Sequence, residues 1–423
     1  MKKLLLFALM ASTILSQNID ACTVISYALK GEVYAAANED DYMGFARVWF
    51  NPKTADRYGS VCFGLPDMQA QAAINEHGLF YDFTAQNIDP NQFHFKNVFS
   101  GDLFFEILGK CKTVPEAMVY LDKYDYTASA QILIADALGN SIIINAGTKL
   151  AKSGAYQINT NFDISKLKTK SYLCRRYDIS DEALRKATVL NVPLFRDVLN
   201  RTRQEGKLST IYSNIYDLKR KIITVYNFHD FEHPWVIDLK KELAKGYRLE
   251  KLSNRFPTSF AYEQFLMSDK AMYRKEAILD EINTKGLQPT LNNYFDLGRN
   301  TEKKDSTLNS ILLEVGIQLV KESYNQYANG GLWEYWFEMP GGFKIENIND
   351  KRIRAAGEIF NYLKTEKGID NKLQHFIFEL SAYVNLVQGD RNRAKEYYSI
   401  ASASSTDTWP ISFNRSKKML AIL

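Results

Sequence analysis

The chain has few cysteines, little proline and no long apolar segment beyond its first twenty residues. Its 423 residues contain four cysteines and five histidines, and no two cysteines form a Cys-x-x-Cys pair. This scatter excludes a disulfide scaffold and gives no support for a structural metal site. A membrane-spanning helix needs about 20 apolar residues, so the sequence also excludes a multi-span membrane protein.

Neither sign of charge dominates. The 53 basic and 49 acidic residues leave a net charge of +4 at pH 7, too small and too evenly spread for a nucleic-acid surface or a polybasic membrane patch. Only 10 prolines, together with 13% aromatic residues, argue against disorder. At about 150 residues per domain, the composition predicts a folded chain of two or three domains with no nucleic-acid partner.

The amino-terminal segment has the three-part layout of a secretory signal peptide. Two lysines follow the initial methionine, residues 4–15 are apolar or small, and residues 16–21 turn polar and end in alanine. The apolar part is too short for a transmembrane helix. We predict that residues 1–21 are removed on export to the periplasm or the outside of the cell. The mature chain would then begin at Cys22 and carry no integral membrane segment.

Three interpretations of Cys22 are open on this evidence alone. Residues 19–22 could form the lipid-attachment box of a lipoprotein, although Asp20 would place a charge beside the modified cysteine. Cys22 could also simply fall near the cleavage point and pack or pair in the fold. Thirdly, cleavage could create an amino-terminal nucleophile, because an α-amine with a pKa of about 7.7–8.0 can take the thiol proton directly or through one water.

Residues 22–255 alternate between strand-like and helical patterns. Helices are expected at about 101–110, 115–124, 172–186 and 192–203. Strands are expected at 23–27, 33–37, 72–74, 79–83, 132–136, 141–145, 156–160, 211–217 and 222–228. Strands, two helices, strands, two helices and strands in this order predict an α+β domain built in layers.

Strand signals vanish after residue 255, and apolar residues then recur at helical spacing to the end of the chain. We therefore predict a helical C-terminal domain over residues 256–423. Its clearest part is residues 379–402, which resemble one tetratricopeptide-type hairpin with a turn at Gly389-Asp390. This domain is either a helical cap on the preceding domain or a module that binds a partner.

Short motifs between residues 22 and 250 carry a resemblance to a known family. In order, they are Cys22-Thr23, Asn38-Glu39-Asp40, Ile74-Asn75-Glu76-His77-Gly78-Leu79, Ile134-Ala135-Asp136, Thr160-Asn161, Arg175-Arg176-Tyr177 and Ile211-Tyr212-Ser213-Asn214. The ordered set resembles the choloylglycine hydrolase and penicillin V acylase group, and the related acyl-coenzyme A:6-aminopenicillanate acyltransferase peptidases. The resemblance implies an αββα amino-terminal nucleophile hydrolase over residues 22–255, which cleaves linear amides without a cofactor or metal.

The resemblance also implies roles for single residues. Cys22 would be the nucleophile and its α-amine the base, and Asp40 matches the aspartate that fixes both groups. Asn161 matches an asparagine that holds the amine and helps to stabilise the oxyanion. Arg176 matches the arginine that keeps the site electropositive, and Arg175, one position away, is the alternative and an expected substrate contact.

Asn38 and Thr84 are the other residues expected to bind substrate. The position just before Asn38, where the bile-salt and penicillin enzymes usually carry an arginine, is Ala37, so one cation beside the thiol is missing. A second oxyanion asparagine after the strand at 79–83 is not evident, and Thr84, Gln86 or a backbone amide would take its place.

The resulting hypothesis is an exported cysteine amidohydrolase that acts through an acyl-cysteine intermediate. Its partners would be small acyl amides such as conjugated bile acids or penicillin-like compounds, and an acyltransferase results if an amine replaces water. The competing hypothesis is a lipid-anchored binding or scaffold protein in which Cys22 is acylated. Hydrolases of this group are often homo-oligomers, but the sequence has no interface signature that decides this.

Overall fold

The computed structural model describes residues 22–86, 97, 99, 102–125, 130–145, 148–206, 208–268, 270–299, 307–323, 350–366, 369, 371–403 and 410–423. The predicted signal peptide, residues 1–21, lies outside the described residues.

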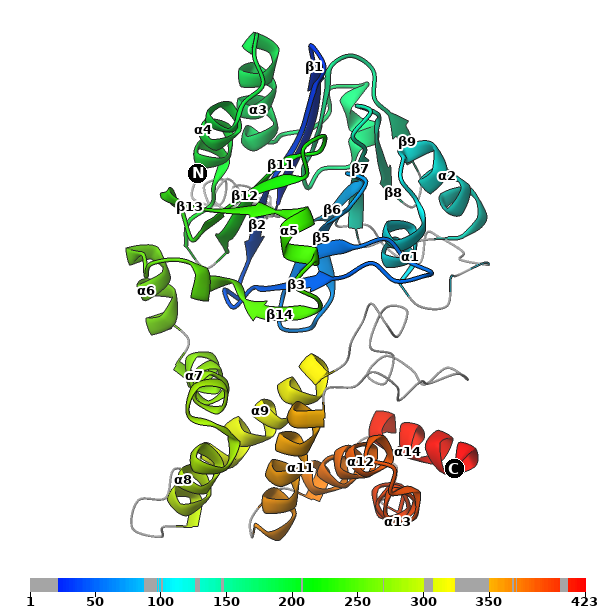
Figure 1. The fold of residues 1–423 in the computed structure, drawn as a ribbon, viewed down its shortest axis with the longest axis vertical. Helices are drawn as coiled ribbons and strands as arrows, with labels where there is room; N and C mark the ends of the chain where they lie inside the picture. The colour runs from blue at the N-terminus through cyan, green and yellow to red at the C-terminus, as the bar shows by residue number, and fades with distance from the viewer. Residues whose placement is uncertain are drawn as a thin grey trace, which may run out of the picture.

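Two antiparallel sheets form the first part of the chain (Figure 1). The six-stranded sheet has, in spatial order, β10 (Tyr156–Asn159), β1 (Thr23–Leu29), β2 (Glu32–Asp41), β11 (Ser209–Asp217), β12 (Ile222–Asn227) and β13 (Asp230–Asp238). The eight-stranded sheet has β14 (Arg248–Lys251), β3 (Arg47–Asn51), β4 (Ser60–Gly64), β5 (Ala70–Asn75), β6 (Phe80–Ala85), β7 (Ala130–Ala135), β8 (Ser141–Asn145) and β9 (Thr148–Ala151).

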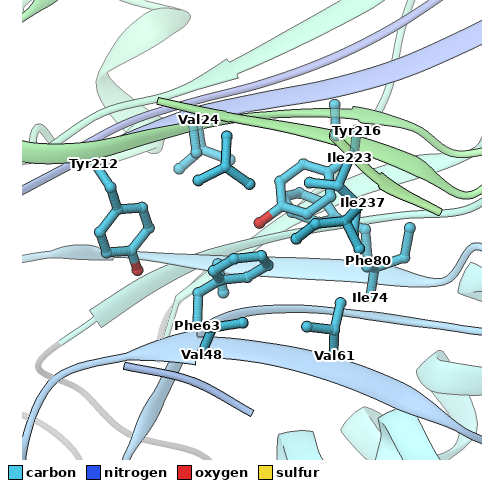
Figure 2. Close-up of a cluster of buried hydrophobic side chains, with 14 of the residues drawn as sticks. Val24, Val48, Val61, Phe63, Ile74, Phe80, Tyr212, Tyr216, Ile223 and Ile237 are labelled. Atoms are coloured by element: carbon cyan, nitrogen blue, oxygen red, sulfur yellow. The ribbon is translucent and has the colours of Figure 1, made fainter. Parts of the chain in front are cut away.

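A hydrophobic core fills the space between the two sheets (Figure 2). Val24 of β1 and Tyr212 and Tyr216 of β11 extend from the six-stranded sheet toward the other sheet. Phe63 of β4 and Phe80 of β6 meet them, and the rings of Phe80 and Tyr216 lie 4.6 Å apart. Complete burial of one such side chain contributes about 1.5–3 kcal/mol, so this core holds the sheets face to face.

Helices cover the outer faces of both sheets. α1 (Leu103–Lys110) and α2 (Val114–Lys123) pack on the eight-stranded sheet. α3 (Arg175–Lys186) and α4 (Val192–Thr202) pack on the six-stranded sheet. The layers are therefore helix, sheet, sheet, helix, which confirms the predicted α+β class and αββα sandwich.

The period of two along β2 decides which side chains face the other sheet. Ala35 and Ala37 belong to the core between the sheets, whereas Ala36 packs under the α3–α4 layer. Asn38 continues the helix-facing set, because its amide donates to the carbonyl of Leu199 in α4. Residue 39 consequently faces the interior of the sandwich.

The remaining elements that the structure describes are helices. α5 (Leu239–Leu243) lies before β14, and two short 3-10 helices span Ile164–Leu167 and Leu252–Arg255. The later helices are α6 (Phe260–Ser268), α7 (Lys270–Lys285), α8 (Leu287–Arg299), α9 (Leu308–Ser323), α11 (Asp350–Thr365), α12 (Asn371–Val387), α13 (Arg391–Ala401) and α14 (Pro410–Ile422).

These helices belong to two different cores. Tyr262 of α6 packs into the core between the sheets, whereas a separate apolar core runs from Ile278 of α7 to Met419 of α14. α12 and α13 are joined by a turn in which Gly389 has a φ of +89°, a conformation that favours glycine. Of the helices that the structure describes, none has the length and apolar character needed to cross a membrane.

Candidate active site

Cys22 lies at the entrance to β1, beside the middle strands of the six-stranded sheet. The next residue, Thr23, pairs with Asn38 of β2, which places Cys22 next to Glu39. The thiol is buried, with 9% of the residue exposed. Its Sγ donates a hydrogen bond to Glu39 Oε2 at 3.4 Å. The cysteine therefore faces a carboxylate, on the interior side of its strand.

The surroundings of this thiol favour its protonated form. Burial raises the pKa of Cys22 well above its usual value, and the nearby carboxylates of Glu39, Asp40 and Asp82 raise it further. A hydrogen bond from the backbone N–H of Asp40 acts in the opposite direction. Because only the thiolate is strongly nucleophilic, a reaction at this sulfur needs a nearby group that accepts the proton.

Arg176 connects four residues of the sequence motifs. Its buried guanidinium, at the start of α3, donates to the carbonyl oxygen of Cys22 at 2.5 Å and to Asn161 Oδ1 at 3.0 Å. It also donates to Thr23 Oγ1 at 3.1 Å, and its Nη1 lies 4.0 Å from Asp40 Oδ2. A planar guanidinium has several donors in fixed directions, so it can hold these groups in one arrangement.

Asp40 is buried on the helix-facing side of β2. Its Oδ2 accepts a hydrogen bond from Gln204 Nε2 at 2.6 Å, and its Oδ1 accepts one from the hydroxyl of Thr210. Asn161 follows β10, and its Nδ2 donates to the carbonyl of Ala85 at 2.8 Å. An amide nitrogen carries two hydrogens, and this bond uses one of them.

Asn38 and Thr84, which were expected to bind substrate, form hydrogen bonds within the fold instead. Asn38 Oδ1 accepts from Ser213 Oγ at 2.7 Å, in addition to the bond from its amide to α4. The buried Thr84 hydroxyl lies 3.1 Å from the carbonyl of Thr160, and Gln86 Nε2 donates to the same carbonyl at 3.3 Å. Arg175, in contrast, is exposed at the start of α3.

Two acidic side chains in this site were given no role by sequence reasoning. Glu39 of β2 and Asp82 of β6 are both buried, and each carboxyl group affects the pKa of the other. Burial raises the pKa of Glu39 to about 7. Burial first, and then Glu39, raise the pKa of Asp82 well above its usual range. The available signal was the alternation of each strand, since Ala37 and Phe80, two positions earlier, are core residues.

No group of three or more His, Cys, Asp or Glu side chains among the described residues is arranged to hold a metal ion. His229 and His233 are four residues apart, as in some zinc sites on helices, but the second of them lies within strand β13. His233 Nδ1 instead contacts Asp230 at 2.8 Å.

Neither a family model nor a curated protein matches this sequence. Solved structures do match it. One is a variant of the conjugated bile acid hydrolase from Clostridium perfringens, with 13% identity, 56% of this chain and 99% of that chain covered, and a TM-score of 0.45. A second variant of that enzyme has 14% identity, 56% and 97% coverage and a TM-score of 0.43.

The third is the penicillin V acylase from Agrobacterium tumefaciens, with 17% identity, 55% of this chain and 91% of that chain covered, and a TM-score of 0.42. The sequence motifs resemble the family of these same enzymes. Close to half of the present chain lies outside each match.

Proposed function

We propose that the protein is an exported cysteine hydrolase of linear amide C–N bonds. The observation that carries the proposal is the placement of Cys22, whose thiol contacts a carboxylate while its carbonyl is bound by Arg176. Asn161, held by the same arginine, supplies an amide donor close to this cysteine. A nucleophile, a fixed cation and a donor for an oxyanion are the groups that acyl transfer requires.

The mechanism begins once residues 1–21 have been removed and Cys22 carries a free α-amine. The thiolate attacks the amide carbonyl, and the oxyanion is stabilised by Asn161 and by backbone N–H groups. A side-chain amide directed at such an oxyanion contributes about 3 kcal/mol. The amine then leaves, and water hydrolyses the acyl-cysteine with the α-amine in the role of acid and base.

The proposed substrates are small acyl amides, with conjugated bile acids and penicillin-like amides as the first classes to examine. The two enzyme types named by the structural comparisons supply these candidates. The same acyl-cysteine would give acyl transfer if a second amine were to replace water. Addition of a competing amine to the assay therefore separates the two reactions, because a transferase forms a new amide.

The first test combines protein chemistry with an activity screen. The protein is produced in an exporting host, and its intact mass and amino-terminal peptide are measured. A chain that begins with an unmodified Cys22 is expected, together with cleavage of at least one amide in the panel. Cys22→Ser should lower kcat by at least about 10³-fold, whereas Cys174→Ser, a change at a partly exposed cysteine, should leave it unchanged.

Two results would contradict the proposal. A diacylglycerol group on the Cys22 sulfur would block the nucleophile, and the protein would then be a lipid-anchored binding protein. Equal amide turnover by the wild type and by Cys22→Ser would show that another residue is the nucleophile.

A further inference from the structure

We propose that Glu39, paired with Asp82, is the catalytic group that accepts the proton of the Cys22 thiol. The α-amine of Cys22 is then left to serve the leaving amine and the incoming water. This inference rests on the proposed function, because it concerns the first step of the same reaction.

The contact between Cys22 and Glu39 is fixed by the sheet. Thr23 pairs with Asn38, so β1 and β2 hold the two residues side by side on the interior face. The thiol already donates to Glu39 Oε2, with 3.4 Å between the sulfur and the oxygen. A proton acceptor must lie within hydrogen-bond reach of the proton that it takes, and Glu39 meets this condition without any rearrangement.

The other half of the argument is the carboxyl pair itself. Glu39 Oε1 and both oxygens of Asp82 are buried, and no side chain in the described part of the chain donates to them. Two carboxylates are both acceptors and cannot hydrogen-bond to each other. Burial and the nearby Glu39 carboxylate raise the pKa of Asp82 well above its usual range, so the pair keeps one proton, as in other carboxyl pairs that share a buried site. Asp82 holds that proton, and Glu39 Oε2 is left to accept from the thiol.

The titratable groups that act on Glu39 lie on or beside four strands. They are Cys22 just before β1, Asp82 on β6, Tyr212 and Tyr216 on β11, and the neighbouring carboxylates of Asp40 and Asp41 on β2 itself. None of these groups is a cation. Burial raises the pKa of Glu39, the contacts with Asp82 and Cys22 lower it, and the charges of Asp40 and Asp41 raise it again. The resulting pKa is about 7, where a general base is most effective at neutral pH. Burial also raises the pKa of both tyrosines, so they stay neutral.

The proton balance of the reaction then closes. The S–H proton moves to Glu39 as the sulfur forms a bond to the amide carbon and the carbonyl electron pair moves to oxygen. The α-ammonium group donates a proton to the nitrogen as the C–N bond breaks. Water then adds to the thioester carbon and gives one proton to the α-amine. When the C–S bond breaks, the thiolate recovers its proton from Glu39.

The test measures the reactivity of the thiol itself and needs no substrate. The mature chain is alkylated with iodoacetamide at a series of pH values, and the Cys22 peptide is quantified by mass spectrometry, with Cys174 as the internal comparison. In the wild type, the alkylation rate of Cys22 should rise with pH, and the midpoint of this rise should lie near pH 7. Glu39→Gln should remove this rise and lower the rate at pH 7 by at least tenfold, while Cys174 is unchanged.

Asp82→Asn is the matched control, because it changes the same buried pair but leaves a carboxylate against the sulfur. It should keep the rise near pH 7. In amide hydrolysis, Glu39→Gln should lower kcat by about 10²–10³-fold with little change in KM, and Asp82→Asn should have a much smaller effect. Equal losses in the two variants would show that the pair acts only through packing, which would overturn the inference.

Other outcomes are also decisive. If Glu39→Gln retains the wild-type alkylation profile, the inference is wrong even where Cys22-dependent hydrolysis persists. If the wild type cleaves no amide, the proposed function fails, but the alkylation profile still decides the role of Glu39. Should Glu39→Gln not fold, Glu39→Asp retracts the carboxylate by one methylene. That variant should keep the rise near pH 7 at a lower rate, and an unchanged rate would refute the role.

Discussion

Arg47 and Glu276 form a buried ion pair that joins the sandwich to the helical region. Nη2 of Arg47, on β3, lies 3.0 and 2.9 Å from the two carboxylate oxygens of Glu276 on α7. Its Nε donates to Glu322 of α9 at 3.0 Å. Burial raises the pKa of Glu322, but Arg47 and Arg352 more than offset this effect and the pKa is lowered. The charged state of this junction is therefore the stable one.

Arg47→Met should destabilise the protein strongly. It leaves two buried carboxylates without their shared cation, and loss of one partner of a buried pair costs about 3–5 kcal/mol. The free energy of unfolding, measured by urea denaturation, checks this prediction. The matched control is Arg220→Met, because Arg220 binds Glu32 and Asp217 at the surface and exposed pairs contribute about 0–1 kcal/mol. Equal losses in the two variants would contradict it.

Arg176→Lys should lower kcat without a comparable change in KM. The lysine ammonium is a point charge and cannot reproduce the fork that binds the Cys22 carbonyl and the Asn161 side chain together. Displacement of a reacting group by about 1 Å costs about 10²-fold in rate, and we expect a loss of this order on an amide that the wild type cleaves. The pH dependence of kcat should keep its shape, because Arg176 positions groups and transfers no proton.

The adjacent Arg175 supplies the matched control for this measurement. Its side chain is exposed, so Arg175→Lys should leave kcat within about twofold of the wild type, as is usual for surface changes. A large loss for Arg175→Lys, with none for Arg176→Lys, would show that Arg175, and not Arg176, is the arginine that corresponds to the family motif.

The strands that the sequence predicted are those with a clear alternation or a turn signal. β1 and β2 flank a turn with a positive φ at Gly31. β1 was expected at nearly the observed position, whereas β2 continues to Asp41, four residues beyond its expected end at residue 37. β3 and β4 were missed because each is a completely buried run of five residues, which has no polar side to reveal a period. β14 was missed for the opposite reason. Its residues Arg248–Lys251 are all partly exposed, and pairing with β3 is what makes them a strand.

The residues of the candidate site also fall into two groups, those that the sequence could predict and those that it could not. Cys22, Asp40, Asn161 and Arg176 belong to motifs, and the structure brings Arg176 to the other three. Glu39 and Asp82 could not be joined from the sequence, since their contact crosses from one sheet to the other over 43 positions of the chain. Only the packing of β2 over β6 brings them together, and no local pattern encodes that packing.

Glu39→Gln should stabilise the protein at high pH and not at low pH. The folded state holds the pKa of Glu39 near 7, above its ordinary value of 4.5, so it binds the proton more tightly than the unfolded chain does. Stability is consequently lost as the pH rises from about 4.5 through 7. A neutral glutamine avoids that loss, which we expect to be on the order of 3 kcal/mol at pH 8.

Urea denaturation at pH 4 and pH 8 measures the difference. The gain from Glu39→Gln should be large at pH 8 and close to zero at pH 4, where the wild-type carboxyl is protonated in the folded state. Glu182→Gln is the control, since the pKa of this exposed carboxyl is lowered by Lys186 and its removal should give no gain at pH 8. An equal effect of Glu39→Gln at both pH values would mean that no buried charge develops. A variant that is more stable at pH 8 but slower in catalysis would show that the carboxylate is kept for the reaction at the expense of the fold.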